Sequence, residues 1–459
     1  MIEGLKPYAE YKESGQKWLG DVPRHWSLKP GHAAFAKRKV PNIGMKEKAV
    51  LSLSYGRIKV KATDKQHGLV PESYDTYQIV NEGNIIIRGT DMQNDHTSLR
   101  IGLSRNRGII SSAYLCLEAQ PAVTPDYGYQ ILNVFDLTKA IYRYGSGLRQ
   151  NLDHGEIKRL PIFLPPLDEQ AAIVRFLDHA NGRMERAIRA KKKLMALLHE
   201  QKQAIIHRAV TRGLNPKAAL KPSGIPWLGD VPKHWEVSRS KYVFREVDNR
   251  SATGQELRLS MCQKRGLIPS SEIEVKRLVS ESAVGAKICE AGDLVLNRLK
   301  AHLGVFALAS IRGLVSPDYT ILRPARAMCS RYFELIYRTP ACRVELRKRA
   351  KGIVQGFWRL YTDDFYDIRV PVPPVPEQER IANQLDADLG TLNTALARTE
   401  REIGLLREYR TRLVADVVTG KLDVRAAAAK LPAEPQEAII SENSSDEAGI
   451  ADETEIEET

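Results

Sequence analysis

Three groups of residues in this 459-residue chain are rich in Arg, Lys, Asn and Gln, the side-chain types that can hydrogen-bond to nucleic acids. Arg, Lys, Asn and Gln on loops reach base edges and phosphates. The candidate contacts are Arg88, Arg105 and Arg107, with Arg100 between them; Arg149, Gln150 and Asn151; and Asn297, Arg298 and Lys300 with Gln355, Trp358 and Arg359. The glycine-flanked loops 146–151 and 351–359 are the strongest candidates, because each precedes a proline step. A solvated side chain or a structural ion pair is the simpler interpretation of any single arginine, so the prediction concerns the set.

Catalytic motifs are absent from the sequence. It contains no GxxxxGK[ST] phosphate loop, no glycine-rich strand-to-helix turn followed by an acid, and no HExxH or paired-histidine spacing. The Pro-Pro steps at 165–166 and 373–374 lack the preceding Asn and the following aromatic residue of an adenine methyltransferase motif. Asp318, Asp363 and Asp364 could imitate a nuclease cluster, but acidic surface residues are common. We therefore predict a chain that is not an enzyme by itself and that needs no metal or cofactor of its own.

The charge of the chain is large and unevenly distributed. The formal net charge is +13, while residues 431–459 contain ten acidic side chains and no basic one, so residues 1–430 carry +23. This excess favours a polyanionic partner, with nucleic acid first; a generally basic soluble protein is the alternative. The acidic tail has few residues to bury and is predicted to be disordered.

Cysteine usage and hydropathy indicate a cytoplasmic protein. The five cysteines form no CxxC pair, are odd in number, and are interpreted as reduced thiols: Cys116, Cys262, Cys289, Cys329 and Cys342. No apolar run reaches the length of a membrane span, and the first residues do not have the pattern of a signal peptide. We therefore expect no membrane partner.

An internal repeat is the strongest pattern in the sequence. The motif SGxxWLGDVPxHW occurs at residues 14–26 and again at 223–235, with ten of its thirteen positions identical. A proline step, a Glu-Gln pair and about forty helix-compatible residues begin at Leu164 and again at Val372. A period of 208–209 residues is too long for a solenoid and indicates two copies of a whole module.

Both helical stretches have the apolar spacing of a coiled coil. Residues alternate at intervals of three and four, which is the seam of paired helices. The predicted seam comprises Met184, Ile188, Met195, Leu198 and Ile205 in the first stretch and Leu392, Leu396, Ile403, Leu406 and Leu413 in the second. Gly182 and Gly390 correspond and predict a kink or a close helix contact.

The sequences between these anchors diverge. Residues 27–160 and 236–368 contain short β-type runs broken by Gly, Asn and Pro. Weak correspondences persist between 83–87 and 292–296 and between 111–114 and 316–319. The sequence therefore predicts two domains that share a fold and differ in their surfaces, although neutral drift would also produce divergence.

The repeated opening, the diverged domains and the PPxxEQ helices together resemble the DNA-specificity (S) subunit of type I restriction-modification systems, over residues 8–425. The resemblance implies that each diverged domain is a target-recognition domain that reads half of a bipartite site in double-stranded DNA. It also implies that the two helices pack antiparallel, set the spacing and dock two methyltransferase subunits, which motor-nuclease subunits then join. S-adenosylmethionine, ATP and magnesium are expected in those partners.

The predicted fold class is α+β, with two similar target-recognition domains joined by two long antiparallel helices in a pseudo-twofold repeat. The predicted segments are a first recognition domain at 1–163, a helix at 164–215, a second recognition domain at 216–371, a helix at 372–425 and an acidic tail at 426–459. The alternative is a non-catalytic coiled-coil adaptor whose basic domains bind RNA or protein, in which Phe357 and Trp358 could stack on bases. An independent nuclease or methyltransferase is a third possibility.

Overall fold

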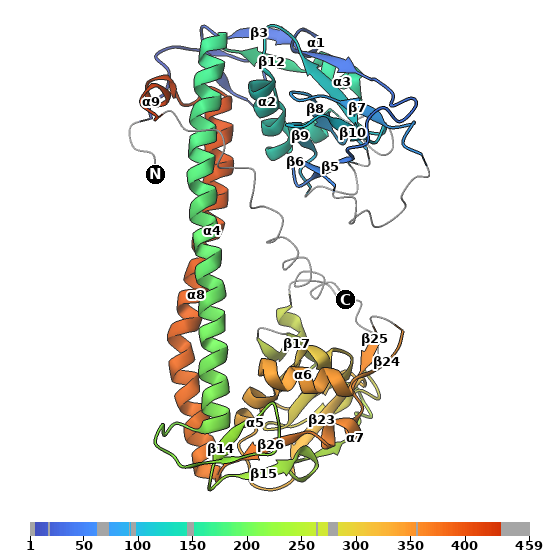
Figure 1. Cartoon of the computed structure of the whole chain (residues 1–459), viewed down its shortest axis with the longest axis vertical. Helices are drawn as coiled ribbons and strands as arrows, with labels where there is room; N and C mark the ends of the chain where they lie inside the picture. Colours follow the sequence, from blue (N-terminus) through green and yellow to red (C-terminus); the bar gives the residue numbers. More distant parts are fainter. Residues whose placement is uncertain are drawn as a thin grey trace. The chain divides into compact units, whose positions relative to one another are not determined.

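The chain folds into two compact units that each contain a globular domain and half of each long helix. The computed structural model describes residues 5–16, 19–61, 73–90, 92, 98–144, 151–262, 265–273, 283–354 and 357–432. Unit 1 comprises Met1–Ala190 with Glu402–Thr459, and unit 2 comprises Lys191–Arg401. The long helices are α4 (Leu167–Arg212) and α8 (Val375–Val418) (Figure 1). The two helices are confirmed, but the division into compact units falls in the middle of both.

The domain of unit 1 is built on an antiparallel sheet. Its strands follow the order β4 (Phe35–Arg38), β11 (Leu115–Ala119), β8 (Ile85–Ile87) and β9 (Ile101–Leu103). Ile85 and Leu117 face helix α2 (Pro125–Leu137) and share a buried cluster with its Ile131 (Figure 1). Ile86 and Cys116 point to the other face, because successive strand residues alternate in direction. There they meet β5 (Leu51–Ser54), β7 (Gln78–Val80) and β10 (Gly108–Ile110).

The domain of unit 2 repeats this layering strand for strand. Its sheet has the order β16 (Phe244–Val247), β23 (Tyr319–Pro324), β20 (Leu294–Asn297) and β21 (Phe306–Leu308). Leu294 and Leu322 pack on helix α5 (Ser330–Tyr337), while Val295 and Ile321 face the opposite side. That side holds β17 (Leu259–Cys262), β19 (Lys287–Cys289) and β22 (Gly313–Val315). Ile85 pairs with Leu117 as Leu294 pairs with Leu322, so the predicted correspondences between the copies are confirmed.

Short elements complete the two domains. In unit 1 they are α1 (Gly31–Ala34), β6 (Arg57–Val60), η2 (Ala140–Arg143), α3 (His154–Arg159) and α9 (Arg425–Ala429). In unit 2 they are η3 (Ser240–Tyr242), β18 (Gly266–Pro269), η4 (Ser270–Glu272), η5 (Arg298–Leu303), α6 (Pro340–Arg349), β24 (Lys351–Val354), β25 (Phe357–Arg359) and α7 (Thr362–Tyr366). Helix α9 lies within the predicted tail, and its Ala428 is buried, so ordered structure extends further than predicted; residues 433–459 lie outside the described part.

The repeated opening motif forms the same strand in both copies. Its Asp-Val-Pro segment is a strand, β2 (Asp21–Pro23) or β14 (Asp230–Pro232), paired with β1 (Tyr11–Glu13) or β13 (Leu220–Pro222). The next strands, β3 (Ser27–Pro30) and β15 (Glu236–Arg239), pair with β12 (Pro161–Leu164) and β26 (Arg369–Val372), which lead into the proline steps. The opening motif and the start of the long helix are therefore adjacent in space.

Glu169, in the first turn of α4, connects the start of this helix to the opening segment of the chain. Its carboxylate is 3% exposed and accepts hydrogen bonds from the Tyr8 hydroxyl (2.6 Å), from His25 Nε2 (2.7 Å) and from Trp26 Nε1 (2.9 Å). Burial and then the bond to Glu169 raise the pKa of Tyr8 well above its usual value, so its hydroxyl remains a donor. Three donors satisfy a charge that would otherwise be costly to bury.

The neighbouring glutamine fixes the same helix start to the rest of the domain. The Gln170 amide donates to the carbonyls of Ala122 and Pro165 at 3.0 Å, and its oxygen accepts the N–H of Thr124 at 2.9 Å. Thr124 is the N-cap of α2. Gln378 repeats this arrangement in unit 2, where it donates to Pro373 O (2.8 Å) and accepts from Cys329 N (2.9 Å). The Glu-Gln pair is therefore a structural joint.

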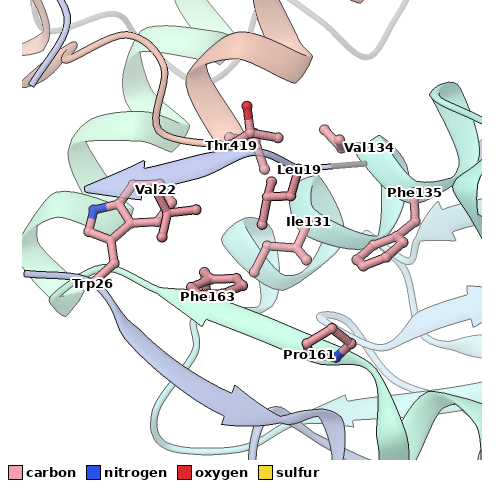
Figure 2. Close-up of a pocket in the computed structure, with 10 residues that line it drawn as sticks. Leu19, Val22, Trp26, Ile131, Val134, Phe135, Pro161, Phe163 and Thr419 are labelled. Atoms are coloured by element: carbon pink, nitrogen blue, oxygen red, sulfur yellow. The ribbon is translucent and has the colours of Figure 1, made fainter. Parts of the chain in front are cut away.

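Figure 2 shows the apolar part of the joint in unit 1. Leu19, Val22 and Trp26 from the opening motif lie opposite Phe163, with Thr419 at the end of α8 beside them. The remaining cavity measures about 30 Å³, which is about the volume that one water molecule occupies in the liquid, and its lining is mostly apolar. We interpret it as a packing gap.

The long helices run antiparallel within each unit. In unit 1 the first half of α4 shares a buried cluster with the last half of α8, and in unit 2 the last half of α4 packs on the first half of α8. Cross-helix contacts join Arg410 to Glu185 at 3.5 Å in unit 1 and Lys202 to Asn393 at 2.7 Å in unit 2. No described helix is both long and apolar enough to cross a membrane.

The predicted seam residues differ in burial. The buried ones are Met184, Ile188, Leu396, Ile403 and Leu413; the half-buried ones are Met195, Leu198, Ile205, Leu392 and Leu406. The close contact predicted at the two helix glycines is not found. A Cβ at Gly182 would meet only the Arg186 side chain, at 3.6 Å, and one at Gly390 would meet nothing within 4 Å.

We predict that Glu169→Ala destabilises the protein more than the matched variant Glu377→Ala. The first leaves the buried Trp26 indole and the Tyr8 hydroxyl without an acceptor and should cost about 2–4 kcal/mol. The second loses the bond from His234 Nε2 (2.8 Å), while Trp235 Nε1 has no described acceptor in the native chain, so about 1 kcal/mol is expected. Thermal unfolding followed by circular dichroism gives the comparison, and equal losses would contradict this account of the joint.

Candidate nucleic-acid interface

In unit 2 the fold brings together the two polar stretches predicted from sequence. Leu360 N–H donates to Arg298 O at 3.1 Å, which joins the loop after β25 to the end of β20. Asp318 receives both arginines: Arg298 Nε donates to its carbonyl (2.8 Å) and Arg359 to its carboxylate (3.3 Å). The Arg359 guanidinium also lies over the Tyr361 ring at 6.0 Å. These residues form one polar surface on unit 2.

The other predicted residues of unit 2 border this surface. The Asn297 side chain caps η5 by accepting the N–H groups of Leu299 (3.1 Å) and Lys300 (3.3 Å). Trp358 is half-buried on β25, opposite Gly352. Gln355 and the side chain of Phe357 lie outside the described part of the chain.

Unit 1 makes the same junction from equivalent residues. Leu152 N–H donates to Gly89 O at 2.8 Å, just as Leu360 does to Arg298. The strand and loop registers thus place Arg88 where unit 2 has Asn297, and Asn151 where unit 2 has Arg359. Arg88 and Asn151 are both exposed. Arg149 and Gln150 lie outside the described residues, so their role stays a prediction.

The remaining arginines of unit 1 are not gathered at this junction. Arg105 and Arg107 lie beyond the far end of β9, paired with Asp126 (2.5 Å) and Glu47 (3.1 Å). Arg100 is completely buried: it donates to Thr90 O (2.8 Å) and to Arg88 O (3.2 Å), and its guanidinium lies over the Tyr142 ring. Arg100 therefore holds the backbone at Arg88 and Thr90 from the interior of the domain. The prediction that it is a surface contact is wrong.

A cavity of about 250 Å³ opens beside the junction in unit 1. It is lined chiefly by polar and basic residues: Lys37, Arg38, Lys39, Gln78, Asn151, Asp153 and His154, with Cys116. The Nε2 atom of His154 is buried and has no hydrogen-bond partner among the described residues. Burial and the nearby Lys158 and Lys37 lower the pKa of His154, which favours the neutral ring. Sequence reasoning selected only Asn151 here; the three consecutive cations at 37–39 were the signal it missed.

No group of acidic, histidine or cysteine side chains in the described residues could hold a metal ion. Of the acids considered for a nuclease, Asp318 pairs with Arg359, and Asp364 pairs with Lys351 at 2.8 Å. Burial raises the pKa of the Cys116 thiol to about 11, which makes a poor nucleophile.

Comparisons with known proteins were made over the whole chain, and no family model matches it. Two curated proteins of Methanocaldococcus jannaschii are similar over most of its length. One carries the name of the MjaX type I restriction enzyme specificity subunit, with 19% identity over 90% of this chain and 98% of that protein. The other is the MjaVIII type I restriction enzyme specificity subunit, with 22% identity over 76% of this chain and 81% of that protein.

A solved structure shares the fold. It is a chain from work on complex assembly and conformational transition of the type I R-M system, 16% identical, with a TM-score of 0.61, covering 87% of this chain and 99% of that chain. These relationships support the expected specificity subunit and not the RNA- or protein-binding adaptor.

Because the raised pKa keeps the Cys116 thiol protonated near neutral pH, we predict slow alkylation of the native protein at pH 8. The thiolate fraction should grow about tenfold per pH unit up to about pH 10, and the rate with it. Mass spectrometry of the Cys116 peptide after iodoacetamide treatment measures this rate, with Cys116→Ser as the blank. A rate that levels off near pH 8 would show that the thiol is activated.

Proposed function

We propose that this chain, which belongs to the family of type I restriction enzyme specificity subunits, is the DNA-recognition subunit of a type I restriction-modification complex. Unit 1 reads one half of a bipartite site in double-stranded DNA, and unit 2 reads the other half. The observation that carries the proposal is the duplicated junction. The same backbone hydrogen bond holds different polar side chains, Asn151 in unit 1 and Arg359 in unit 2, at equivalent positions of one fold.

These side chains suit base recognition. Arginine binds guanine with two hydrogen bonds, and asparagine does the same with adenine. The Arg359 side chain is 38% exposed, and Asn151 stands on an exposed loop. Equivalent positions with different hydrogen-bonding groups would let one fold read two different half-sites.

Partner subunits supply the catalysis in this proposal. A base inside a duplex must be flipped out before it can be methylated, and no motif of this chain provides the pocket for that reaction. Two methyltransferase subunits, one for each half-site, and motor-nuclease subunits complete the complex. The five buried seam residues pack inside the chain, so the partners must dock on outward faces of α4 and α8.

The experiment that tests this function is methylation by a reconstituted complex. The chain is purified with its methyltransferase subunits and supplied with S-adenosylmethionine and a randomised DNA library. Adenine methylation at a split, asymmetric motif is expected, and the chain alone should methylate and cleave nothing. Activity of the isolated chain, or methylation independent of it, would refute the proposal.

We predict that the two half-sites can be altered separately. Arg359→Ala should relax selection in the half-site of unit 2 by about 1–3 kcal/mol, and Asn151→Ala should do so in the half-site of unit 1. The control is Arg326→Ala, because Arg326 lies beyond the far end of β23 and pairs with Glu236 at 3.3 Å. Selection from a DNA library gives each preference, and a variant that weakens both half-sites equally would contradict the division.

We also predict that the long helices set the distance between half-sites. A seven-residue insertion after Ala190 and another after Arg401 fall at the boundary between units, so packing inside each unit is retained. Seven helical residues add about 10 Å, which is about three base pairs of DNA. The preferred spacer should lengthen by that amount while both half-site sequences stay unchanged. A graded series of spacers measures it, and an unchanged preference would show that the helices set no distance.

A further inference from the structure

The cavity of unit 1 and the equivalent place in unit 2 have opposite charge. Strand pairing puts Lys37, Arg38 and Lys39 where unit 2 has Glu246, Val247 and Asp248, because Arg38 pairs with Cys116 as Val247 pairs with Ile321. The strand beside them has Gln78 in unit 1 and Lys287 in unit 2. These four positions carry +3 in unit 1 and −1 in unit 2.

In unit 2 the charged side chains at this place pair with one another. The Lys287 ammonium is 3% exposed and lies 3.6 Å from Glu246 and 3.5 Å from Asp248. It also donates to Tyr319 O at 2.9 Å. Thr362 donates to the remaining oxygen of Glu246 at 2.6 Å. The chain itself thus supplies the cation that the two carboxylates hold.

In unit 1 the described residues balance the three cations at 37–39 less completely, because Asp153 is the one acid in the lining. Gln78 takes the place of the lysine and donates to Tyr114 O at 2.6 Å, which is the counterpart of the Lys287 bond to Tyr319. Lys37 and Lys39 are exposed and form no ion pair with any residue that the structure describes. The one acid in the lining, Asp153, is the N-cap of α3, and its pKa is lowered by its hydrogen bonds with Glu156 and Gly155 and by the charge of Lys37.

From this contrast we propose that the cavity of unit 1 binds a phosphate of the DNA backbone through Lys37 and Lys39, and that unit 2 binds none at the equivalent place. The inference rests on the proposed function and assigns a ligand to this site. A phosphodiester fits the chemistry of the lining: it is an anion that accepts hydrogen bonds, and the lining includes two lysines whose ammonium groups can donate them. The 250 Å³ cavity has room for the group. Arg38 is a positioning residue, because its guanidinium donates to Ile79 O.

If this site binds a phosphate, removing its lysines should change how DNA affinity depends on salt, and removing a lysine elsewhere in unit 1 should not. A lysine–phosphate contact releases a counter-ion, so the slope of log K against log salt is about −0.9 per contact. Lys37→Ala and Lys39→Ala should each make this slope shallower, together by about 1 if they share one phosphate, without changing which bases are preferred. Lys29→Ala is the matched control, because Lys29 is an exposed lysine of unit 1 outside the lining.

The test measures DNA affinity of the reconstituted complex across a salt series, with single linkages in the half-site of unit 1 replaced by neutral methylphosphonate. One linkage should weaken the wild type and leave the double variant Lys37→Ala, Lys39→Ala unaffected. The same scan over the other half-site should affect the wild type and the double variant equally.

Several results would contradict the proposal that this cavity binds a DNA phosphate. They are an unchanged slope in the double variant, an equal effect of Lys29→Ala, or a change in base preference, which would mean that the cavity reads bases. Protection of Lys37 and Lys39 from acetylation by inorganic phosphate alone, as strong as that by DNA, would reassign the cavity to a free phosphate. If the wild-type complex binds no DNA, the proposed function fails first and this site with it.

Discussion

The buried carboxylate of Glu169 is the constraint on which unit 1 depends. A charge in the first turn of a helix is favoured by the free N–H groups there, but burial makes it costly unless donors surround it. Tyr8, His25 and Trp26 provide those donors from residues 143 to 161 positions away. The domain and its helix can therefore close only in one relative placement. This requirement explains why the opening motif ends in His-Trp and why the proline step is followed by Glu-Gln.

A joint fixed in this way allows the polar surface to change without loss of the fold. The layers on both faces of the sheet contain the same kinds of apolar residue in the same register, such as Ile86 in unit 1 and Val295 in unit 2. Polar positions beside the sheet differ between the units, such as Gln78 and Lys287, and each forms its own hydrogen bond to the backbone. Lys37 and Glu246 occupy one position with opposite charge, which is tolerable because each stands at the rim of its domain.

The sequence predicted the long helices, the repeat and the presence of short strands between the repeated segments, because these depend on local periodicity and on identity between the copies. It could not predict which polar residues reach the surface. Arg100 and Arg88 look alike in the sequence, but Arg100 is buried beneath the backbone at Arg88 and Thr90. That difference arises from pairing between β8 and β9 and from the position of Tyr142, which no local pattern encodes. For the same reason, the run at 37–39 became a candidate only when Gln78 and His154 were found beside it.

The two units also differ in how their joints are connected, and this has a consequence for folding. In unit 2 the chain passes directly from α4 through Gly213 into β13 and the opening motif, so this unit is one continuous segment of residues 191–401. In unit 1 the end of α8 is joined to the opening segment only by non-covalent contacts. Lys6 and Asp423 form an isolated antiparallel β-bridge through their backbones. The Tyr11 hydroxyl donates to Gly420 O at 3.2 Å, and Arg425 lies over the Tyr8 ring at 5.2 Å. Unit 1 therefore cannot close until residues beyond 402 have been made, whereas unit 2 can fold as soon as its own contiguous segment is complete. The three donors to Glu169 hold together a joint that must first bring distant segments of the chain into contact.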